Sequence, residues 1–138
     1  MKIYYAASIA SLNGDPQFND LIISYLRNQG TILSELLFKP NYRANETLDS
    51  LGIHDRDLDW VKESDVIVAD VSVPSLGVGY ELAHAKLWEK KVICLCDMRR
   101  CIRLSPMIEG HAKFEVIKFR EDKEVLKTLD ALFSSFKT

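Results

Sequence analysis

Residues 65–71 read Asp-Val-Ile-Val-Ala-Asp-Val, and residues 74–81 read Pro-Ser-Leu-Gly-Val-Gly-Tyr-Glu. The first run is short and almost entirely apolar, which is typical of a buried strand in a parallel sheet. The second run leads into a helical pattern over residues 80–89, and it brings two glycines, a hydroxyl and a carboxylate to the end of that strand. Ligands bind at the carboxyl ends of the strands in an open α/β sheet, so this junction predicts a ligand site.

Apolar strands and helices alternate along the rest of the chain, which indicates a parallel sheet with helices on both faces. Because crossovers between parallel strands are right-handed, we expect a Rossmann-like, flavodoxin-like α/β fold with five strands, in a single domain over residues 1–138. Residues 39–50 are expected to form a loop or short helix over the active face, and residues 99–110 to be irregular. The expected strands are residues 1–7, 31–37, 65–71, 91–96 and 114–119, and the expected helices cover residues 18–26 (with a glycine stop at Gly30), 53–64, 80–89 and 123–136.

The composition excludes several classes of protein. A net charge of −2, with 28% charged residues, provides no basic surface for a nucleic acid polymer or an anionic membrane. No apolar run approaches the roughly 20 residues that span a bilayer. The first residues enter a strand directly, so we expect no signal peptide.

The three cysteines predict reduced thiols and a cytoplasmic protein. Cys94 and Cys96 lie in an apolar strand, where we expect them to be buried, and Cys101 makes the number odd. Cys-x-Cys has no further cysteine or histidine at ligand spacing, and the three histidines show no such spacing either, so we expect no metal site.

The glycine-containing turn favours an anion. Gly77 and Gly79 let the backbone approach a ligand, and the N–H groups of the following helix attract phosphate. Leu82 stands where a dinucleotide fingerprint has its third glycine, and the Gly-Lys-Ser/Thr ending of a P-loop is missing. Taken alone, Glu81 is most simply an acid in the first turn of a helix, where the helix dipole favours it.

Other polar residues converge on the same edge of the predicted sheet. Asp57 precedes Leu58 at the border of an apolar helix face and can point into the cleft, whereas Asp55 and Asp59 face another direction. Three serines follow predicted strands, and together they suit a phosphate or sugar, although singly each is typical of a turn or helix cap. One of the two tyrosines at positions 4 and 5 is expected in the core and the other near the site. The three serines are Ser8, Ser75 and Ser105.

Three segments together resemble a known family. Asp57-Leu58-Asp59-Trp60, the strand at residues 65–71 and the motif at residues 74–82 closely resemble the 2′-deoxynucleoside 5′-phosphate N-hydrolases, which belong to the nucleoside 2-deoxyribosyltransferase superfamily. The resemblance is strong over residues 54–96 and weaker at residues 4–9 and 104–110.

The resemblance implies roles for three residues. Glu81 matches the nucleophile that attacks the anomeric carbon of deoxyribose, and Asp57 matches the acid/base that helps the base leave and then activates water. Tyr4 matches the tyrosine that supports the glutamate. Such a double displacement passes through a covalent sugar–enzyme intermediate and needs carboxylates about 5 Å apart.

The resemblance also implies how the substrate is held. The three serines match hydroxyls that bind the 5′-phosphate, with Ser105 supplied by the other subunit of a homodimer. Gly77 and Gly79 match glycines that shape the pocket, and Met107 is expected to bind substrate beside Ser105.

Two positions bear on the phosphate. Related transferases that act on unphosphorylated nucleosides typically have an aspartate where this chain has Ser75, and a neutral hydroxyl accepts a phosphate neighbour that an aspartate repels. The hydrolases usually carry an arginine where this chain has Ala10, and a charged hydrogen bond of that kind contributes roughly 1.5–3 kcal/mol. The cations that remain to replace it are Arg99, Arg100, Arg103 and Lys39.

The implied activity is hydrolysis of the N-glycosidic bond of 2′-deoxynucleoside 5′-monophosphates. The products are free base and 2-deoxyribose 5-phosphate, the substrate is a small molecule, and no metal or organic cofactor is expected. The near alternative is a nucleoside 2-deoxyribosyltransferase, in which a second base replaces water. An alternative of another class is a non-catalytic nucleotide-binding module.

Overall fold

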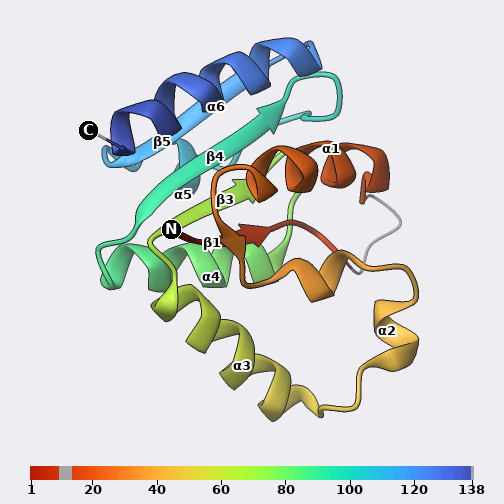
Figure 1. Cartoon of the computed structure of the whole chain (residues 1–138). Helices are drawn as coiled ribbons and strands as arrows, with labels where there is room; N and C mark the ends of the chain where they lie inside the picture. Colours follow the sequence, from red (N-terminus) through yellow and green to blue (C-terminus); the bar gives the residue numbers. More distant parts are fainter. Residues whose placement is uncertain (10–13, 138) are drawn as a thin grey trace.

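The chain forms one five-stranded sheet with helices on both faces (Figure 1). A computed structural model describes residues 1–9 and 14–137. In chain order the elements are β1 (Lys2–Ala6), α1 (Pro16–Arg27), β2 (Thr31–Ile32), the 3₁₀ helix η1 (Glu35–Phe38), α2 (Tyr42–Asn45), α3 (Ser50–Glu63), β3 (Val66–Asp70), α4 (Leu76–Leu87), β4 (Lys91–Asp97), α5 (Pro106–Glu109), β5 (Phe114–Phe119) and α6 (Asp122–Phe136).

The strand order is β2-β1-β3-β4-β5, and each neighbouring pair is parallel. This is the flavodoxin-like order, so the predicted fold class is confirmed. The order reverses between β1 and β3, whose carboxyl ends therefore lie side by side: Tyr4 pairs with Ile67 and Ala6 with Ala69. A ligand site is expected outside such a reversal, because the following loops diverge there to opposite faces.

Two apolar clusters, one on each face of the sheet, hold the helices in place. Side chains alternate along a strand, so Tyr5 joins the cluster with α1 and α6, whereas Tyr4 joins the cluster with α3 and α4. Figure 1 shows α1 and α6 on one side of the sheet and α3 and α4 on the other. Tyr4 is therefore the tyrosine that faces α3 and α4.

A buried polar network joins the carboxyl ends of β3 and β4. The Ser72 hydroxyl donates to Asp70 Oδ1 at 2.6 Å and accepts from the Asp97 backbone N–H at 2.8 Å. Arg100 Nη2 donates to Asp70 Oδ2 at 2.9 Å, and its Nε donates to Asp97 Oδ2 at 3.2 Å. Buried carboxylates need hydrogen-bond partners. Since Ser72 provides some of these bonds, the network also fixes the first residues of the segment between β3 and α4.

The second strand is shorter than predicted, and Ser34 supplies the reason. Its hydroxyl accepts from the Tyr5 backbone N–H at 2.9 Å and donates to the Tyr5 carbonyl at 2.7 Å. A side chain thus occupies both backbone groups with which a longer β2 would pair. The prediction of a strand over residues 31–37 was wrong beyond Ile32, and the chain continues into η1.

Several other predicted boundaries shift, because caps act earlier than the apolar pattern suggested. The Asp49 side chain accepts from the Gly52 N–H at 2.9 Å and starts α3 three residues before the predicted position. Residues 106–109 form the short helix α5 within the segment predicted to be irregular.

Gly30, the predicted stop after α1, does not adopt a left-handed conformation. A Cβ at this position would lie 2.2 Å from the Met1 carbonyl oxygen, so glycine is needed there for close packing.

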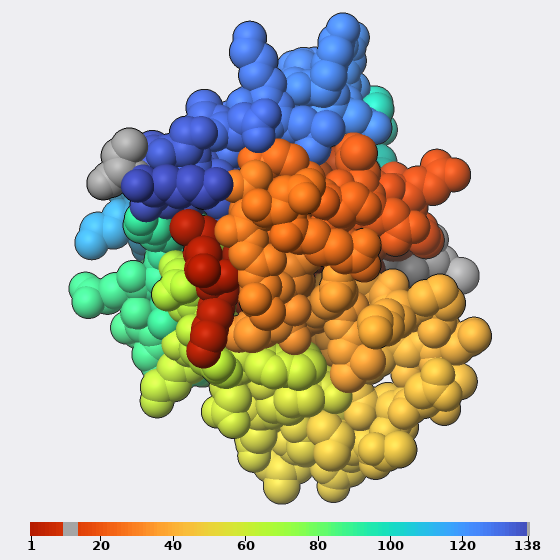
Figure 2. Space-filling view, viewed as in Figure 1, coloured from red at the N-terminus to blue at the C-terminus, as the bar shows by residue number. Residues whose placement is uncertain are grey.

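Two further predictions from composition have structural counterparts. Cys94 and Cys96 are buried, and all three cysteines are free thiols. Among the described helices, none combines the length and apolar content that crossing a membrane requires. Figure 2 shows the segment from η1 through α2 to α3 (orange to yellow) as a continuous band along one side of the surface.

Replacing Ser34 with alanine should destabilise the protein by roughly 2–4 kcal/mol, because two buried backbone groups of Tyr5 lose their partner. Urea unfolding monitored by circular dichroism measures the difference. Ser24→Ala is the matched control, since Ser24 is exposed on α1. Equal stability of the two variants would contradict this account of β2.

Candidate active site

The local fold gives Glu81 a different position from the one predicted. Ser75 is the N-cap of α4, where its Oγ accepts from the Val78 N–H at 3.3 Å, so the helix starts at Leu76. Glu81 lies in the second turn, and the first turn holds no acidic residue. The interpretation of Glu81 as a helix-dipole residue is therefore wrong. Its Oε2 is buried and has no hydrogen-bond partner among the described residues.

Tyr4 of β1 is the direct partner of Glu81. Its hydroxyl donates a hydrogen bond to the Glu81 carboxylate. Burial raises the pKa of Tyr4, and the negative charges of Glu81 and Asp57 raise it further. The phenol therefore keeps its proton and remains a donor.

The Glu81 carboxyl group holds a proton unusually tightly. Burial raises its pKa to about 7, the Tyr4 hydrogen bond lowers it, and the negative charge of Asp57 raises it. A carboxyl group that titrates near neutrality beside a second carboxylate, at the carboxyl edge of a sheet, is a candidate for chemistry.

Asp57 reaches this site from α3. It is half-buried, whereas Asp55 and Asp59 on the same helix are exposed, so the predicted difference in direction is observed. Arg56 Nε donates to Asp57 Oδ1 at 3.0 Å. Burial raises the pKa of Asp57, and the Arg56 hydrogen bond and charge oppose that rise. The structure therefore brings Tyr4, Asp57 and Glu81 into electrostatic contact from three different elements.

Sequence reasoning missed three residues that border Asp57. Arg56 Nη1 donates to Glu46 Oε2 at 2.8 Å, its Nη2 donates to the Tyr42 hydroxyl at 3.1 Å, and that hydroxyl donates to Glu46 Oε2 at 2.6 Å. These bonds connect α3 to α2. Arg56 is adjacent to Asp57 in the sequence, which was a usable signal, but Glu46 lies in a polar segment that carries none.

The glycines of the motif provide space next to Glu81. Gly77 and Gly79 lie within α4 and neither has a positive φ, so the flexible turn expected at this motif is replaced by helix. A Cβ at Gly77 would lie 4.0 Å from both Glu81 Oε1 and Ser75 Oγ, and a Cβ at Gly79 would meet nothing within 4 Å. The Ser75 hydroxyl and the Glu81 carboxylate therefore both border the space that the missing Gly77 side chain leaves.

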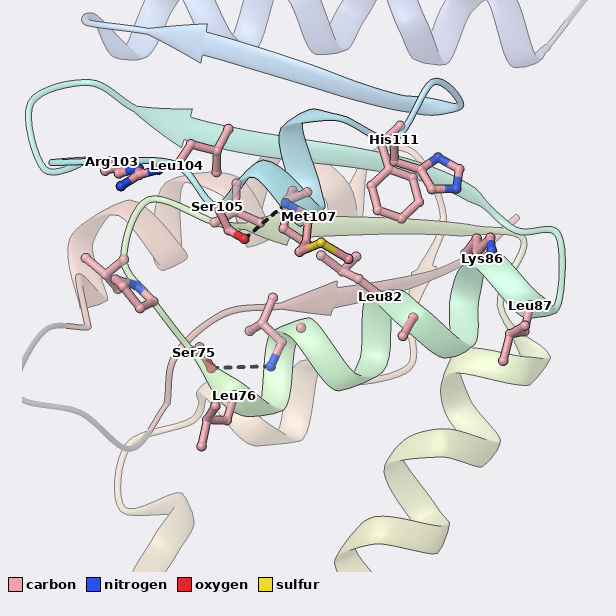
Figure 3. Close-up of a pocket in the computed structure, with 18 residues that line it drawn as sticks. Ser75, Leu76, Leu82, Lys86, Leu87, Arg103, Leu104, Ser105, Met107 and His111 are labelled. Carbon is pink, nitrogen blue, oxygen red and sulfur yellow. Dashed lines mark hydrogen bonds between the residues drawn. The ribbon is translucent and has the colours of Figure 1, made fainter.

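Ser105 and Met107 lie on a different side of α4. Ser105 is the N-cap of α5 and accepts from the Met107 N–H at 3.2 Å. Both residues line a cavity of about 760 Å³ between α4 and α5, together with Ser75 and Gly79 (Figure 3). Its lining does not include Tyr4, Asp57 or Glu81, so within one chain Ser105 is not at the carboxylates.

The other residues that the sequence suggested as phosphate ligands lie on several different elements. Ser8 follows the carboxyl end of β1, and Ala10 lies outside the described residues. Arg99 and Arg100 are engaged by carboxylates, since Arg99 pairs with Asp97 and Asp122, and Arg100 pairs with Asp70 and Asp97. Arg103 lines the cavity with Ser75 and Ser105.

The histidines have other partners than Asp57 and Glu81 among the described residues. His54 Nδ1 is 2.8 Å from Asp55 Oδ1 and its Nε2 is 2.9 Å from the Tyr80 hydroxyl, and His84 Nδ1 is 3.0 Å from the Tyr80 carbonyl oxygen. His111 lines the cavity beside α5. Within residues 1–9 and 14–137, no three histidine, cysteine or acidic side chains are grouped so as to hold a metal ion.

Comparison with known proteins identifies close sequence relatives. The family profile described as nucleoside 2-deoxyribosyltransferase matches residues 3–127. The chain is 36% identical to the 5-hydroxymethyl-dUMP N-hydrolase of Tetraodon nigroviridis (99% of this chain, 100% of the relative) and 37% identical to the human protein of that name (96% and 79%). It is 42% identical to a Trichoplax adhaerens protein (96% and 93%) provisionally named 2′-deoxynucleoside 5′-phosphate N-hydrolase 1.

Solved structures share the fold at lower identity. A CMP N-glycosidase of Clostridium botulinum superposes with a TM-score of 0.68 at 21% identity, over 95% of this chain and 99% of that one. A conserved protein of Enterococcus faecalis superposes with a TM-score of 0.71 at 19% identity, over 95% and 98%.

The raised pKa of Glu81 predicts a pH dependence of stability. Because its pKa is about 7 in the fold against 4.5 ordinarily, the folded state binds more protons between these values, and stability falls as pH rises through that window. Glu81→Gln should remove this decline and be more stable than the wild type at pH 8 by on the order of 3 kcal/mol.

Urea unfolding at pH 4 and pH 8 measures this difference. Glu115→Gln is the control, since Glu115 is exposed on β5. If Glu81→Gln loses stability with pH as the wild type does, burial of Glu81 is not the cause.

Proposed function

The chain belongs to the nucleoside 2-deoxyribosyltransferase family, and we propose that it hydrolyses the N-glycosidic bond of 2′-deoxynucleoside 5′-monophosphates. The products are the free base and 2-deoxyribose 5-phosphate. One observation carries the proposal: the buried Glu81 carboxylate, bonded to Tyr4 and facing the charge of Asp57. The names of the sequence relatives, N-hydrolases of deoxynucleotides, support the choice of reaction.

The reaction proceeds in two displacements. A Glu81 oxygen attacks the anomeric carbon, the N-glycosidic bond breaks with its electrons moving to the base, and Asp57 gives its proton to the departing nitrogen. Water then attacks the same carbon and Asp57 takes a proton from the water. The bond between the sugar and the Glu81 oxygen breaks with its electrons returning to the carboxylate, and 2-deoxyribose 5-phosphate is released. The carboxylate separation of about 5 Å that this sequence of steps requires stays a prediction.

The environment of the two carboxyl groups suits these roles. Two neighbouring carboxyl groups resist double ionisation, so over an intermediate pH range they share one proton. The reaction needs that proton on Asp57 and a negative charge on Glu81. The Tyr4 hydroxyl stabilises the charged form of Glu81, since its hydrogen bond lowers the pKa of that carboxyl group. Tyr4 thereby keeps the nucleophile available in spite of its burial.

We place the 5′-phosphate of the proposed substrate at the N-terminus of α4. Ser75 caps this helix, whose first N–H groups attract an anion, and the bare Gly77 separates the Ser75 hydroxyl from Glu81. With the phosphate at Ser75 and Ser8, the sugar spans the Gly77 side of the helix and presents its anomeric carbon to Glu81. We assign Gly79, Ser105 and Met107 to the same end of the substrate.

Base exchange is the second candidate, because the family description is that of a transferase. Both reactions share the chemistry up to the covalent intermediate. They differ in whether water or a second base attacks it.

The test incubates the protein with deoxynucleotides, including 5-hydroxymethyl-dUMP, and separately with the matching ribonucleotides and nucleosides. We expect the protein to release base from the deoxynucleotides faster than from the other two classes of compound. Chromatography quantifies the base, with and without an added acceptor base. Glu81→Gln and Asp57→Asn should each lower turnover by at least about 100-fold with the fold intact, because nucleophile and acid/base are lost.

Glu115→Gln is the control for general effects of charge removal. Turnover that persists undiminished in either site variant refutes the assignment. A predominance of exchanged nucleoside over sugar phosphate establishes the transferase. Binding of deoxynucleotide without any turnover establishes the non-catalytic module.

We also propose that a second copy of the chain covers the cavity between α4 and α5. Large apolar side chains are exposed around it: Leu76 is 98% exposed, Met107 84% and Leu87 68%. Exposed apolar patches of this kind mark interaction sites. A homodimer through this face brings Ser105 of one copy toward the substrate of the other, as the family resemblance implies.

Light scattering of the purified protein should give the mass of a dimer, and Leu87→Glu should shift it to a monomer, because a charge then enters the interface. Leu51→Glu is the matched control, since Leu51 is equally exposed, at 68%, on α3. Mixing inactive Glu81→Gln with Ser105→Ala should restore activity, because each mixed dimer then has one intact site. A monomeric wild type at micromolar concentration would contradict the dimer.

A further inference from the structure

Arg56 holds together the region beside Asp57. Its three side-chain nitrogens donate to three different groups: Nε to Asp57 Oδ1, Nη1 to Glu46 Oε2 and Nη2 to the Tyr42 hydroxyl. The bonds connect α3 to the segment of α2.

Burial and packing fix the geometry of this arginine. Its side chain is 19% exposed and that of Glu46 12% exposed. The guanidinium carbon lies 4.8 Å from the centre of the Trp60 ring, so a cation–π contact covers one face of the group. Glu46 is itself held, since its Oε1 accepts from the Leu48 N–H at 3.1 Å. Both ends of the bridge are therefore ordered before any ligand binds.

We propose that Arg56 is a positioning residue of the reaction, which orients Asp57 and ties it to Glu46 and Tyr42, so that the α2 segment forms the wall beside the leaving base. The inference rests on the acid/base role proposed for Asp57. An acid that protonates the leaving base lies within hydrogen-bond distance of it, and Glu46 and Tyr42 are bonded to the arginine that holds this acid. Arg56 is not assigned any contact with the reacting atoms.

The bridge also sets the charge around Asp57. The groups that face Asp57 are Arg56 on its own helix, Glu46 and Tyr42 from the α2 segment, Glu81 from α4 and Tyr4 from β1. Arg56 lowers the pKa of Asp57 and Glu46 raises it. Glu46 stays ionised, since its bonds to Tyr42 and Arg56 lower its pKa to about 2. Removing Arg56 should therefore raise the pKa of Asp57, and removing the charge of Glu46 should lower it.

The test measures kcat and KM against pH with a deoxynucleoside 5′-monophosphate for Arg56→Met, Arg56→Lys and Glu46→Gln. Arg56 and Glu46 both act on the pKa of Asp57, so their removal should move the limb of kcat/KM that Asp57 governs. Arg56→Met should move that limb up by about one pH unit, and Glu46→Gln should move it down. Arg56→Lys retains the positive charge but cannot form the three hydrogen bonds of the arginine, so the limb that Asp57 governs should stay in place.

The positioning role predicts a fall in kcat of on the order of 10-fold in both Arg56→Met and Arg56→Lys. Arg120→Met is the matched control, because Arg120 is exposed directly after β5, outside the α2 segment, and its removal changes the net charge equally. It should leave kcat and both limbs unchanged. If Arg56→Met does not fold, Arg56→Lys and Glu46→Gln carry the test.

A pH profile in which neither limb moves in Arg56→Met, or in which a limb moves in the same direction in Arg56→Met and Glu46→Gln, overturns the inference. Carbon-13 NMR titration of the Asp57 carboxyl group provides the same comparison without turnover. Undiminished activity of Asp57→Asn refutes the proposed function instead, so the two failures are distinguishable.

Discussion

The hydrogen bond between the buried Tyr4 hydroxyl and the Glu81 carboxylate is the constraint on which the site depends. A carboxylate in an apolar environment is costly unless a donor satisfies it, and Tyr4 is that donor. The bond forms only if β1 presents Tyr4 to the face that α4 covers. The parallel pairing of β1 with β3 and the start of α4 at Ser75 both contribute to this placement. The pairing of two strands and the position of a helix start thus determine the environment of this carboxylate.

The carboxyl edge of the sheet needs its own support, because two more carboxylates are buried there. Asp70 and Asp97 are satisfied by Ser72 and Arg100, which link β3 to β4 before the chain reaches α4. This network uses Arg100, one of the four cations that the sequence suggested as phosphate ligands. Its bonds to Asp70 and Asp97 satisfy the two buried carboxylates at this edge of the sheet.

Much of the fold was predictable, because buried parallel strands leave a continuous apolar signal, as residues 65–71 do. The failures have a common physical origin in side chains that replace backbone partners. Ser34 ends β2, Asp49 starts α3 and Ser75 starts α4, and none of these roles follows from apolar periodicity. That Tyr4, Asp57 and Glu81 lie close together was predictable from the family resemblance. The bonds of Arg56 to Glu46 and Tyr42 were not, since they join residues ten or more apart and the segment that holds Glu46 and Tyr42 has no regular pattern.

The distribution of charge gives the proposed substrate one orientation. Glu46 and Asp57 place two carboxyl groups on the side of α3 and α2, where Arg56 is bonded to both. A phosphate dianion would be repelled there. At the N-terminus of α4 it would meet the Ser75 hydroxyl and helix N–H groups instead. In the proposed binding mode the phosphate therefore lies at α4 and the base at the wall formed by α2 and Arg56, with the anomeric carbon between them, beside Glu81.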